Sequence, residues 1–130
     1  MEIVIDTSAI LAVITGEPHR PAILAATQGA TLRAPTSLHW EIGNAFSAMI
    51  KRRRITRESA IRAIALYEQI PIAFTEVDLD QAVTLAARQN IYAYDAYVLI
   101  CAQQFALPLI SLDAALVRAA AAIGLGVIDV

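Results

Sequence analysis

Short aliphatic runs alternate along this chain with longer segments in which apolar residues recur every three or four positions. The short runs predict strands buried on both faces, and the longer segments predict helices. The predicted strands are residues 3–5, 31–34, 72–75, 108–112 and 126–128, and the predicted helices are residues 8–15, 21–27, 38–53, 56–69, 78–89, 95–105 and 114–123. Strands that alternate with helices through short loops predict an α/β fold with three α/β/α layers around a central parallel sheet.

The length of 130 residues fits one domain spanning residues 1–130, and no linker or repeat interrupts it. Hydrophobic residues make up 58% of the chain, above the usual ~45–50%. Much of the excess is alanine, so it permits a buried partner interface without requiring one. No apolar run reaches the ~18 residues of a membrane span. The single cysteine, Cys101, cannot form an internal disulfide, which suits the cytoplasm.

Four carboxylates stand next to aliphatic sequence, at or within one turn of the start of a predicted helix. They are Asp6, Glu41, Asp95 and Asp113. An ionised carboxylate beside an apolar core is costly unless it is paired. Asp6 and Asp113 directly follow predicted strands. If those strands are parallel neighbours, both acids lie at the carboxyl edge of the sheet, where ligands bind in such folds.

Helix capping is the competing explanation for three of these acids. Asp is a favoured N-cap, so Asp6, Asp95 and Asp113 could each serve this purpose alone. Glu41 differs, because it lies outside the capping-box position and on the flank of the predicted buried stripe. That stripe consists of Leu38, Ile42, Ala45 and Met49. An acid in that place lacks a structural explanation.

Several anions in one pocket repel one another unless a cation intervenes. Oxygen ligands without histidine or thiol alternatives favour Mg²⁺ or Mn²⁺. Polar side chains near the four acids can support such a site by hydrogen bonds: Thr7, Ser8, Asn44 and Ser111. A metal ion of this kind polarises phosphoryl oxygens and activates water, so the pattern indicates hydrolysis of phosphodiesters.

The basic residues are concentrated in one segment. Six of the ten lie within twelve positions: Lys51, Arg52, Arg53, Arg54, Arg57 and Arg62. This cluster is either a solvated helix end or an edge that binds the phosphates of RNA, with the run 51–54 at its centre. The net charge of −2 does not decide between the two.

One face of the predicted helix 38–53 combines large apolar residues with small ones. Trp40, Gly43, Ser47 and Ile50 lie opposite the predicted buried stripe. Aromatic anchors often carry much of the binding energy of an interface, so Trp40 and Ile50 predict a contact with a second copy of the chain or with a protein partner. The alternative is that the helix 56–69 covers this face.

Four short motifs together resemble the PIN-domain ribonucleases, and among them the VapC-like toxins of bacterial toxin–antitoxin pairs. The motifs are Val4-Ile5-Asp6-Thr7-Ser8-Ala9, Trp40-Glu41-Ile42-Gly43-Asn44-Ala45, Tyr94-Asp95-Ala96-Tyr97 and Ile110-Ser111-Leu112-Asp113. Each motif is weak alone, but their order and spacing across nearly the whole chain are fairly specific.

This resemblance implies an endoribonuclease that depends on Mg²⁺ or Mn²⁺, a cognate antitoxin that inhibits it, and a homodimer. Asp6, Glu41, Asp95 and Asp113 map onto the acidic metal site of the family. Many relatives carry a further acid shortly after the last of these, whereas residues 114–117 here are all apolar. Occupancy of a second metal site is therefore open.

Three other functions fit parts of the pattern. A PIN-like module that binds RNA or protein without turnover would share the fold, although the intact set of four acids argues against it. Phospho-receiver domains and aspartate-dependent phosphatases also carry acidic clusters, but both need a lysine near the phosphoryl group, and the only lysine is Lys51. The phosphatase pattern also requires an acid where Ser8 stands.

Overall fold

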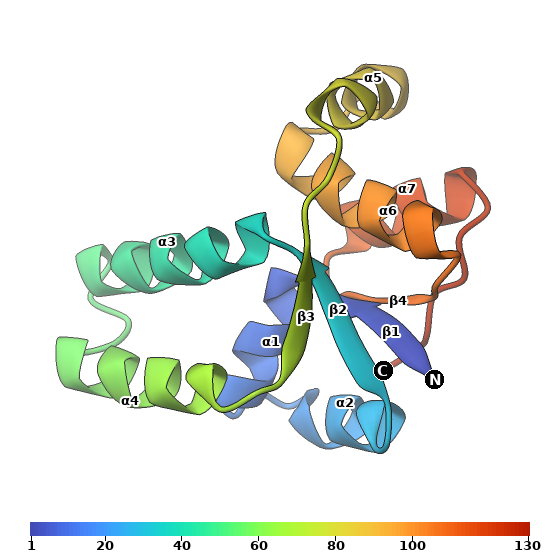
Figure 1. Ribbon diagram of the computed structural model, residues 1–130. Coiled ribbons are helices and arrows are strands. Elements are labelled where there is room, and N and C mark those ends of the chain that lie inside the picture. The colour runs from blue at the N-terminus through green and yellow to red at the C-terminus, as the bar shows by residue number, and fades with distance from the viewer.

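A four-stranded, all-parallel sheet separates two layers of helices in the computed structural model, which describes residues 1–130 (Figure 1). The strand order is β3-β2-β1-β4. The strands are β1 (Glu2–Ile5), β2 (Thr31–Pro35), β3 (Ile72–Thr75) and β4 (Leu109–Ile110). The helices are α1 (Thr7–Ile14), α2 (Arg20–Thr27), α3 (Ser37–Lys51), α4 (Arg57–Glu68), α5 (Leu79–Gln89), α6 (Ala93–Phe105) and α7 (Ala114–Ala122).

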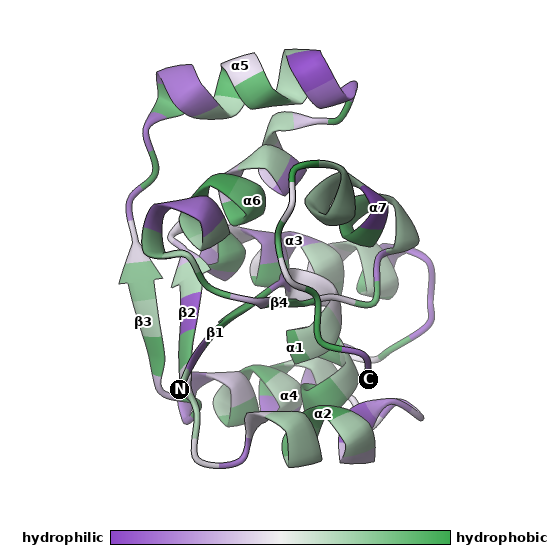
Figure 2. Ribbon diagram, turned by 90° about the vertical axis from the view of Figure 1, so that its right-hand side faces the viewer, coloured by the Kyte–Doolittle hydropathy of each residue, from purple (hydrophilic) through white to green (hydrophobic).

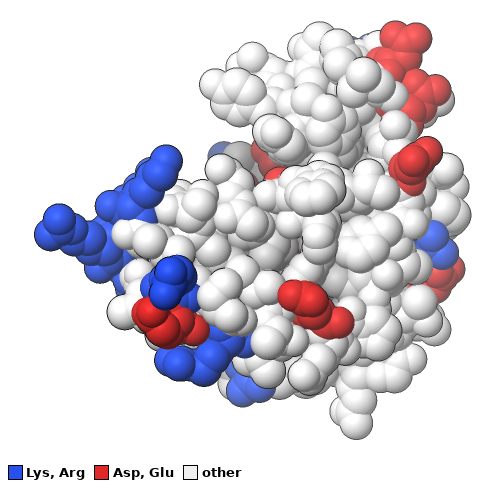
Figure 3. Space-filling view, turned by 60° about the vertical axis from the view of Figure 1, so that its left-hand side comes forward, with Lys and Arg blue, Asp and Glu red and all other residues white.

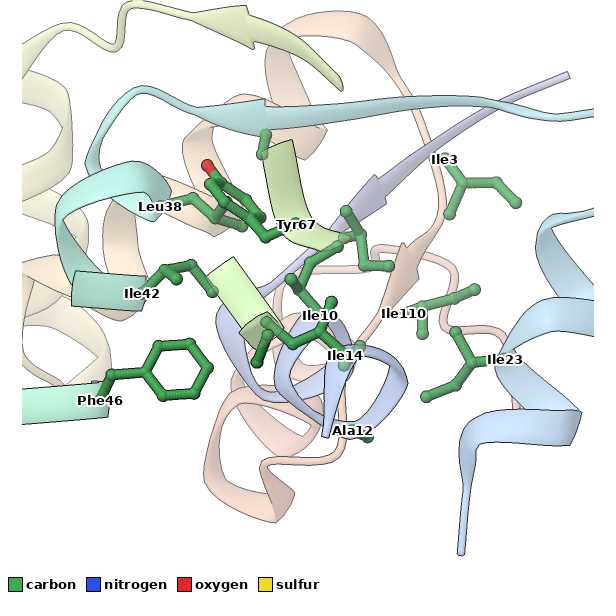
Figure 4. Close-up of a cluster of buried hydrophobic side chains, with 14 of the residues drawn as sticks. Ile3, Ile10, Ala12, Ile14, Ile23, Leu38, Ile42, Phe46, Tyr67 and Ile110 are labelled. Carbon is green, nitrogen blue, oxygen red and sulfur yellow. The ribbon is translucent and has the colours of Figure 1, made fainter. Parts of the chain in front are cut away.

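The central strand β1 sends alternate side chains into two separate cores. Ile3 and Ile5 join a core that α1 to α4 cover, whereas Val4 joins a second core beneath α5, α6 and α7 (Figure 2). Figure 4 shows the first core, in which Ile10, Leu38 and other apolar side chains converge. Full burial of such a side chain stabilises the fold by roughly 1.5–3 kcal/mol. The predicted α/β/α arrangement is confirmed.

Polar side chains cap the starts of α4 and α5, close to the predicted helix starts at residues 56 and 78. Thr56 Oγ1 accepts a hydrogen bond of 3.1 Å from the backbone N–H of Ser59 at the start of α4. Asp78 Oδ1 accepts from the N–H groups of Asp80 and Gln81 at the start of α5. Such caps satisfy donors that the first turn of a helix leaves free.

None of the helices combines the length and apolar character needed to cross a membrane.

The last two predicted strands are shorter than expected. β4 ends at Ile110 instead of residue 112, because the N–H of Leu112 donates to the Ser8 hydroxyl in place of a neighbouring strand. The predicted closing strand 126–128 is reduced to a single parallel bridge between Leu109 and Val127. It keeps two backbone hydrogen bonds of 2.9 Å, from Leu109 N–H to Gly126 and from Ile128 N–H to Leu109.

α6 begins two residues earlier than predicted, at Ala93, with Tyr92 as its N-cap. Asp95 consequently lies in the first turn of α6 and does not cap it, so capping does not explain this acid. In α3 the buried residues are Leu38, Ile42 and Phe46, which places Phe46, not Ala45, in the predicted stripe.

Candidate metal centre

Asp6 joins β1 to α1 at the carboxyl edge of the sheet and is only 5% exposed. Its Oδ1 accepts hydrogen bonds from the Ser8 hydroxyl (2.7 Å) and from the N–H of Ala9 (3.1 Å), which caps α1. Its Oδ2 accepts from the Ser111 hydroxyl (2.6 Å). Burial raises the pKa of Asp6 even so, and the charge of Asp113 raises it further. Asp6 therefore caps α1, and its burial at the same time disfavours its ionised form.

Two serines connect Asp6 to the segment that follows β4. Ser8 Oγ donates to Asp6 and accepts a hydrogen bond of 2.9 Å from the N–H of Leu112. Ser111 Oγ donates to Asp6 and accepts one of 3.0 Å from the N–H of Asp113. The strands β1 and β4 are parallel neighbours, with Ile5 opposite Ile110, so their carboxyl ends meet at this point. Both serines thus hold Asp6 in one orientation.

Glu41 is half-buried on α3, and one of its oxygens has no partner. Burial raises its pKa to about 7, and the charges of Asp6 and Asp95 contribute. Nearby Ser37 and, to a smaller extent, Thr7 lower this pKa, yet Glu41 Oε2 and Ser37 Oγ are both buried without a well-formed hydrogen bond. A buried acceptor without a donor costs about 1–3 kcal/mol. Such an atom is a natural ligand for an incoming cation.

Asp95 and Asp113 differ in how the fold uses them. Asp95 is half-buried and makes no hydrogen bond within the protein; burial raises its pKa, and the charges of Asp113 and Asp6 add to the effect. Asp113 is exposed and caps α7, because its Oδ1 accepts from the N–H groups of Ala115 (2.9 Å) and Leu116 (3.2 Å). The capping explanation holds for this oxygen of Asp113, while Oδ2 remains free for a ligand.

Charges within the set raise the pKa of three of the four acids, although the acids do not form a closed cluster. Asp6, Glu41 and Asp95 each have their pKa raised first by burial and then by the charge of another acid of the set. No three His, Cys, Asp or Glu side chains approach closely enough to enclose a metal ion as they stand. Carboxylates that share a site raise one another's pKa, because a like charge disfavours the ionised form. The oxygen-only donors and the unpartnered Oε2 of Glu41 fit Mg²⁺ or Mn²⁺.

A cavity of about 350 Å³ opens beside Glu41, lined by Thr7, Trp40, Glu41, Asn44, Ala45 and Tyr94. Two of the predicted supporting residues, Thr7 and Asn44, thus face the same space as Glu41. The sequence names Tyr94 only as part of the motif around Asp95 and predicts no role for it, although its place directly before Asp95 is a usable signal. Larger hollows of about 610 Å³ lie along α5 and α6 and near Pro108, but none of the four acids lines them.

The predicted contact face lies on α3, and the predicted basic edge begins at Lys51, the last residue of α3, and continues into the turn that follows. Lys51, Arg52, Arg53 and Arg54 are all exposed, and basic side chains gather at one end of the molecule in Figure 3. That view also shows acidic atoms at the bottom of the hollow between the upper part of the molecule and the part that carries these basic side chains. Along the outer face, Trp40, Gly43, Ser47 and Ile50 are all exposed, so α4 does not cover them.

Comparison with known proteins places this architecture in one family. A model of the PIN domain matches residues 3–122. No curated protein sequence matches the chain.

Among solved structures, the chain is similar to VapBC2 from Rickettsia felis, with a TM-score of 0.68 and 11% identity over 98% of both chains. That structure contains a DNA fragment from the promoter of VapBC2. VapC20 from Mycobacterium tuberculosis, a toxin that cleaves the sarcin-ricin loop, is similar with a TM-score of 0.64 and 16% identity over 95% of both chains. A Pyrobaculum aerophilum structure gives a TM-score of 0.72 and 19% identity over 92% of this chain and 79% of that one. The chain therefore belongs to the PIN domain family, whose members are nucleases.

Proposed function

We propose that this PIN domain is an endoribonuclease that depends on Mg²⁺ or Mn²⁺, and that it is the toxin of a toxin–antitoxin pair. The state of Glu41 is the observation that carries the proposal. Its Oε2 is buried without a partner, and burial together with the charges of two neighbouring acids raises its pKa to about 7. A fold that leaves a carboxylate in this state gains from a cation placed among the acids. The family match excludes the receiver and phosphatase alternatives.

In this proposal the acids, the serines, the residues that line the cavity and the basic run have four different tasks. Asp6, Glu41, Asp95 and Asp113 would hold the cation, which would polarise a phosphoryl oxygen and lower the pKa of bound water. Ser8 and Ser111 keep both oxygens of Asp6 in a fixed orientation. Thr7 and Asn44 line the cavity beside Glu41 and can donate hydrogen bonds to a phosphate there. The run 51–54 supplies exposed positive charge for the RNA backbone.

Two protein partners belong to the proposal. Similar structures include VapBC complexes, which supports a cognate antitoxin as the inhibitor of this chain. The exposed outer face of α3, with Trp40 and Ile50, supports a contact with a second copy or with the antitoxin. Ile50 is better evidence for a protein contact than Trp40, because Trp40 also lines the cavity beside Glu41. Ile50→Asp should shift a homodimer toward monomer in size-exclusion chromatography.

A cleavage assay on purified full chain tests the nuclease proposal. RNA incubated with Mg²⁺ or Mn²⁺ should be cut by the wild type, left intact in EDTA, and left intact by Asp6→Asn. Asp80→Asn is the matched control, because Asp80 is an exposed acid on α5 that does not line the cavity. Cation-independent cleavage would contradict the metal centre. RNA binding without any cleavage would instead identify a catalytically silent PIN-like module.

A further inference from the structure

Two exposed aromatic rings flank the cavity beside the acidic centre. We infer that Trp40 and Tyr94 form a subsite for unpaired nucleobases, which holds single-stranded RNA by stacking next to the carboxylates. The inference rests on the proposed function in that it takes RNA as the ligand. It adds to that function the two residues that select unpaired substrate.

The placement of the rings is the first argument. Trp40 directly precedes Glu41 on α3, and Tyr94 directly precedes Asp95 on α6, so each ring is one residue from an acid of the centre. Both line one cavity of about 350 Å³, together with Glu41 and Thr7. That volume lies within the range of sites for small ligands. A base held there would bring its own phosphate close to the acids.

The second argument is that each ring is held at one side while most of its surface stays free. Trp40 contacts His39 edge-on, with centroids 4.9 Å apart, and His39 Nδ1 is hydrogen-bonded to the hydroxyl of buried Tyr67 at 3.1 Å. Tyr94 contacts half-buried Tyr97 edge-on at 5.9 Å. Trp40 is nevertheless 73% exposed and Tyr94 59% exposed. Rings oriented before binding lose less conformational entropy on stacking a ligand.

Charge favours a nucleic acid over a protein segment as the occupant. Glu41 is the only charged residue of the cavity lining, and Thr7 and Asn44 beside it can donate hydrogen bonds to a phosphate or a base. The basic run begins at Lys51 on the same helix. At 1.5 Å per residue, Lys51 lies about 16 Å along α3 from Trp40, within reach of the backbone of a strand stacked on Trp40. Bases inside a duplex cannot stack on the rings, whereas splayed single-stranded bases can.

The single tryptophan makes the inference directly measurable, because all tryptophan fluorescence comes from Trp40. The full chain in EDTA is titrated with a short single-stranded oligoadenylate, with an abasic strand of equal length and charge, and with a duplex. We expect quenching by the oligoadenylate alone. In a labelled-RNA binding assay, Trp40→Ala and Tyr94→Ala should each weaken the oligoadenylate complex by about 5-fold to 100-fold, and Trp40→Phe should restore much of the loss.

Tyr92→Ala is the matched control, because Tyr92 is 86% exposed on the same segment but does not line the cavity. Equal affinity for the abasic strand, or unchanged affinity of both alanine variants, overturns the subsite. An altered oligomeric state of Trp40→Ala with unchanged RNA affinity also overturns it and makes Trp40 an interface residue. Base-dependent quenching without cleavage on adding Mg²⁺ would uphold the subsite and reject the nuclease. Cleavage with an unchanged KM for Trp40→Ala would uphold the nuclease and reject the subsite.

Discussion

Ser111 Oγ donates a 2.6 Å hydrogen bond to Oδ2 of Asp6, although the two residues are 105 positions apart in the sequence. Ser8 holds the other oxygen of Asp6 from the start of α1. The carboxylate is therefore fixed on both sides, as a ligand or catalytic group must be to act with defined geometry. This bond also joins the ends of β1 and β4, so the centre and the fold depend on the same contact.

Ser111→Ala should lower the free energy of unfolding by about 1–3 kcal/mol. The variant removes a donor from a buried carboxylate and an acceptor from the N–H of Asp113. Urea denaturation in EDTA measures the loss as a shift in midpoint at constant slope. Ser47→Ala is the control, since the exposed hydroxyl of Ser47 bonds only to the carbonyl of Asn44 on its own helix. Equal losses for both variants would show that Asp6 does not need this donor.

Glu41→Gln should flatten the dependence of stability on pH. In the wild type, burial raises the pKa of Glu41 from 4.5 to about 7, so the folded state keeps a proton that the unfolded state loses. The free energy of unfolding should consequently fall as the pH rises through this window and level off above it. After allowance for solvent screening, the two profiles should diverge by on the order of 1 kcal/mol. Parallel profiles in EDTA would show that Glu41 titrates normally.

Asp95→Asn and Asp6→Ala should have opposite effects on stability while both abolish cleavage. The Asp95 side chain makes no hydrogen bond within the protein, and burial raises its pKa, so removing its charge should stabilise the protein in EDTA. After allowance for solvent screening, the gain should be at most about 1 kcal/mol. Asp6→Ala removes an N-cap and leaves two serine hydroxyls without their acceptor, which should cost about 0.5–2 kcal/mol. Thermal melts of both variants provide the measurement. Destabilisation by Asp95→Asn would mean that this charge supports α6 instead.

Mg²⁺ or Mn²⁺ should stabilise the wild type against unfolding, because a ligand that binds only the native state shifts the equilibrium by mass action. At a concentration 100 times the Kd, the expected gain is about 2.7 kcal/mol. The gain should shrink sharply in Glu41→Gln and persist in Asp80→Asn, measured as melting temperature against cation concentration. An undiminished gain in Glu41→Gln would remove Glu41 from the centre.

Arg52→Glu combined with Arg54→Glu should weaken RNA binding and reduce its dependence on salt. Each phosphate contact on a single strand contributes about 0.7 to the slope of log K against log salt, so losing two contacts reduces the slope by about 1.4. Titrations at several salt concentrations measure it. The control pair, Arg20→Glu with Arg118→Glu, makes the same change of charge at exposed positions on α2 and α7. An equal reduction in the control would mean that net charge alone matters.

Local sequence patterns determined much of the secondary structure. The continuous run Ile3–Ile5 predicts a doubly buried strand, and β1 buries all three residues because both of its faces are covered. Thr56 and Asp78 predict helix starts, because a cap depends on donors only two or three residues away. The boundary of β4 escaped prediction, because it depends on the hydroxyl of Ser8, 104 positions from Leu112.

For the candidate site, too, some features followed from local sequence and others only from the tertiary structure. The sequence by itself determined that four acids stand at or near helix starts, because these positions follow from local periodicity. The prediction that an acid directly follows a strand is confirmed for Asp6 and wrong for Asp113, which lies three residues beyond the end of β4. Only the tertiary structure decided that Glu41 keeps an oxygen without a partner and that Trp40 shares a cavity with Tyr94. Burial and hydrogen bonding between distant residues depend on which strands and helices become neighbours, and no local period encodes that choice.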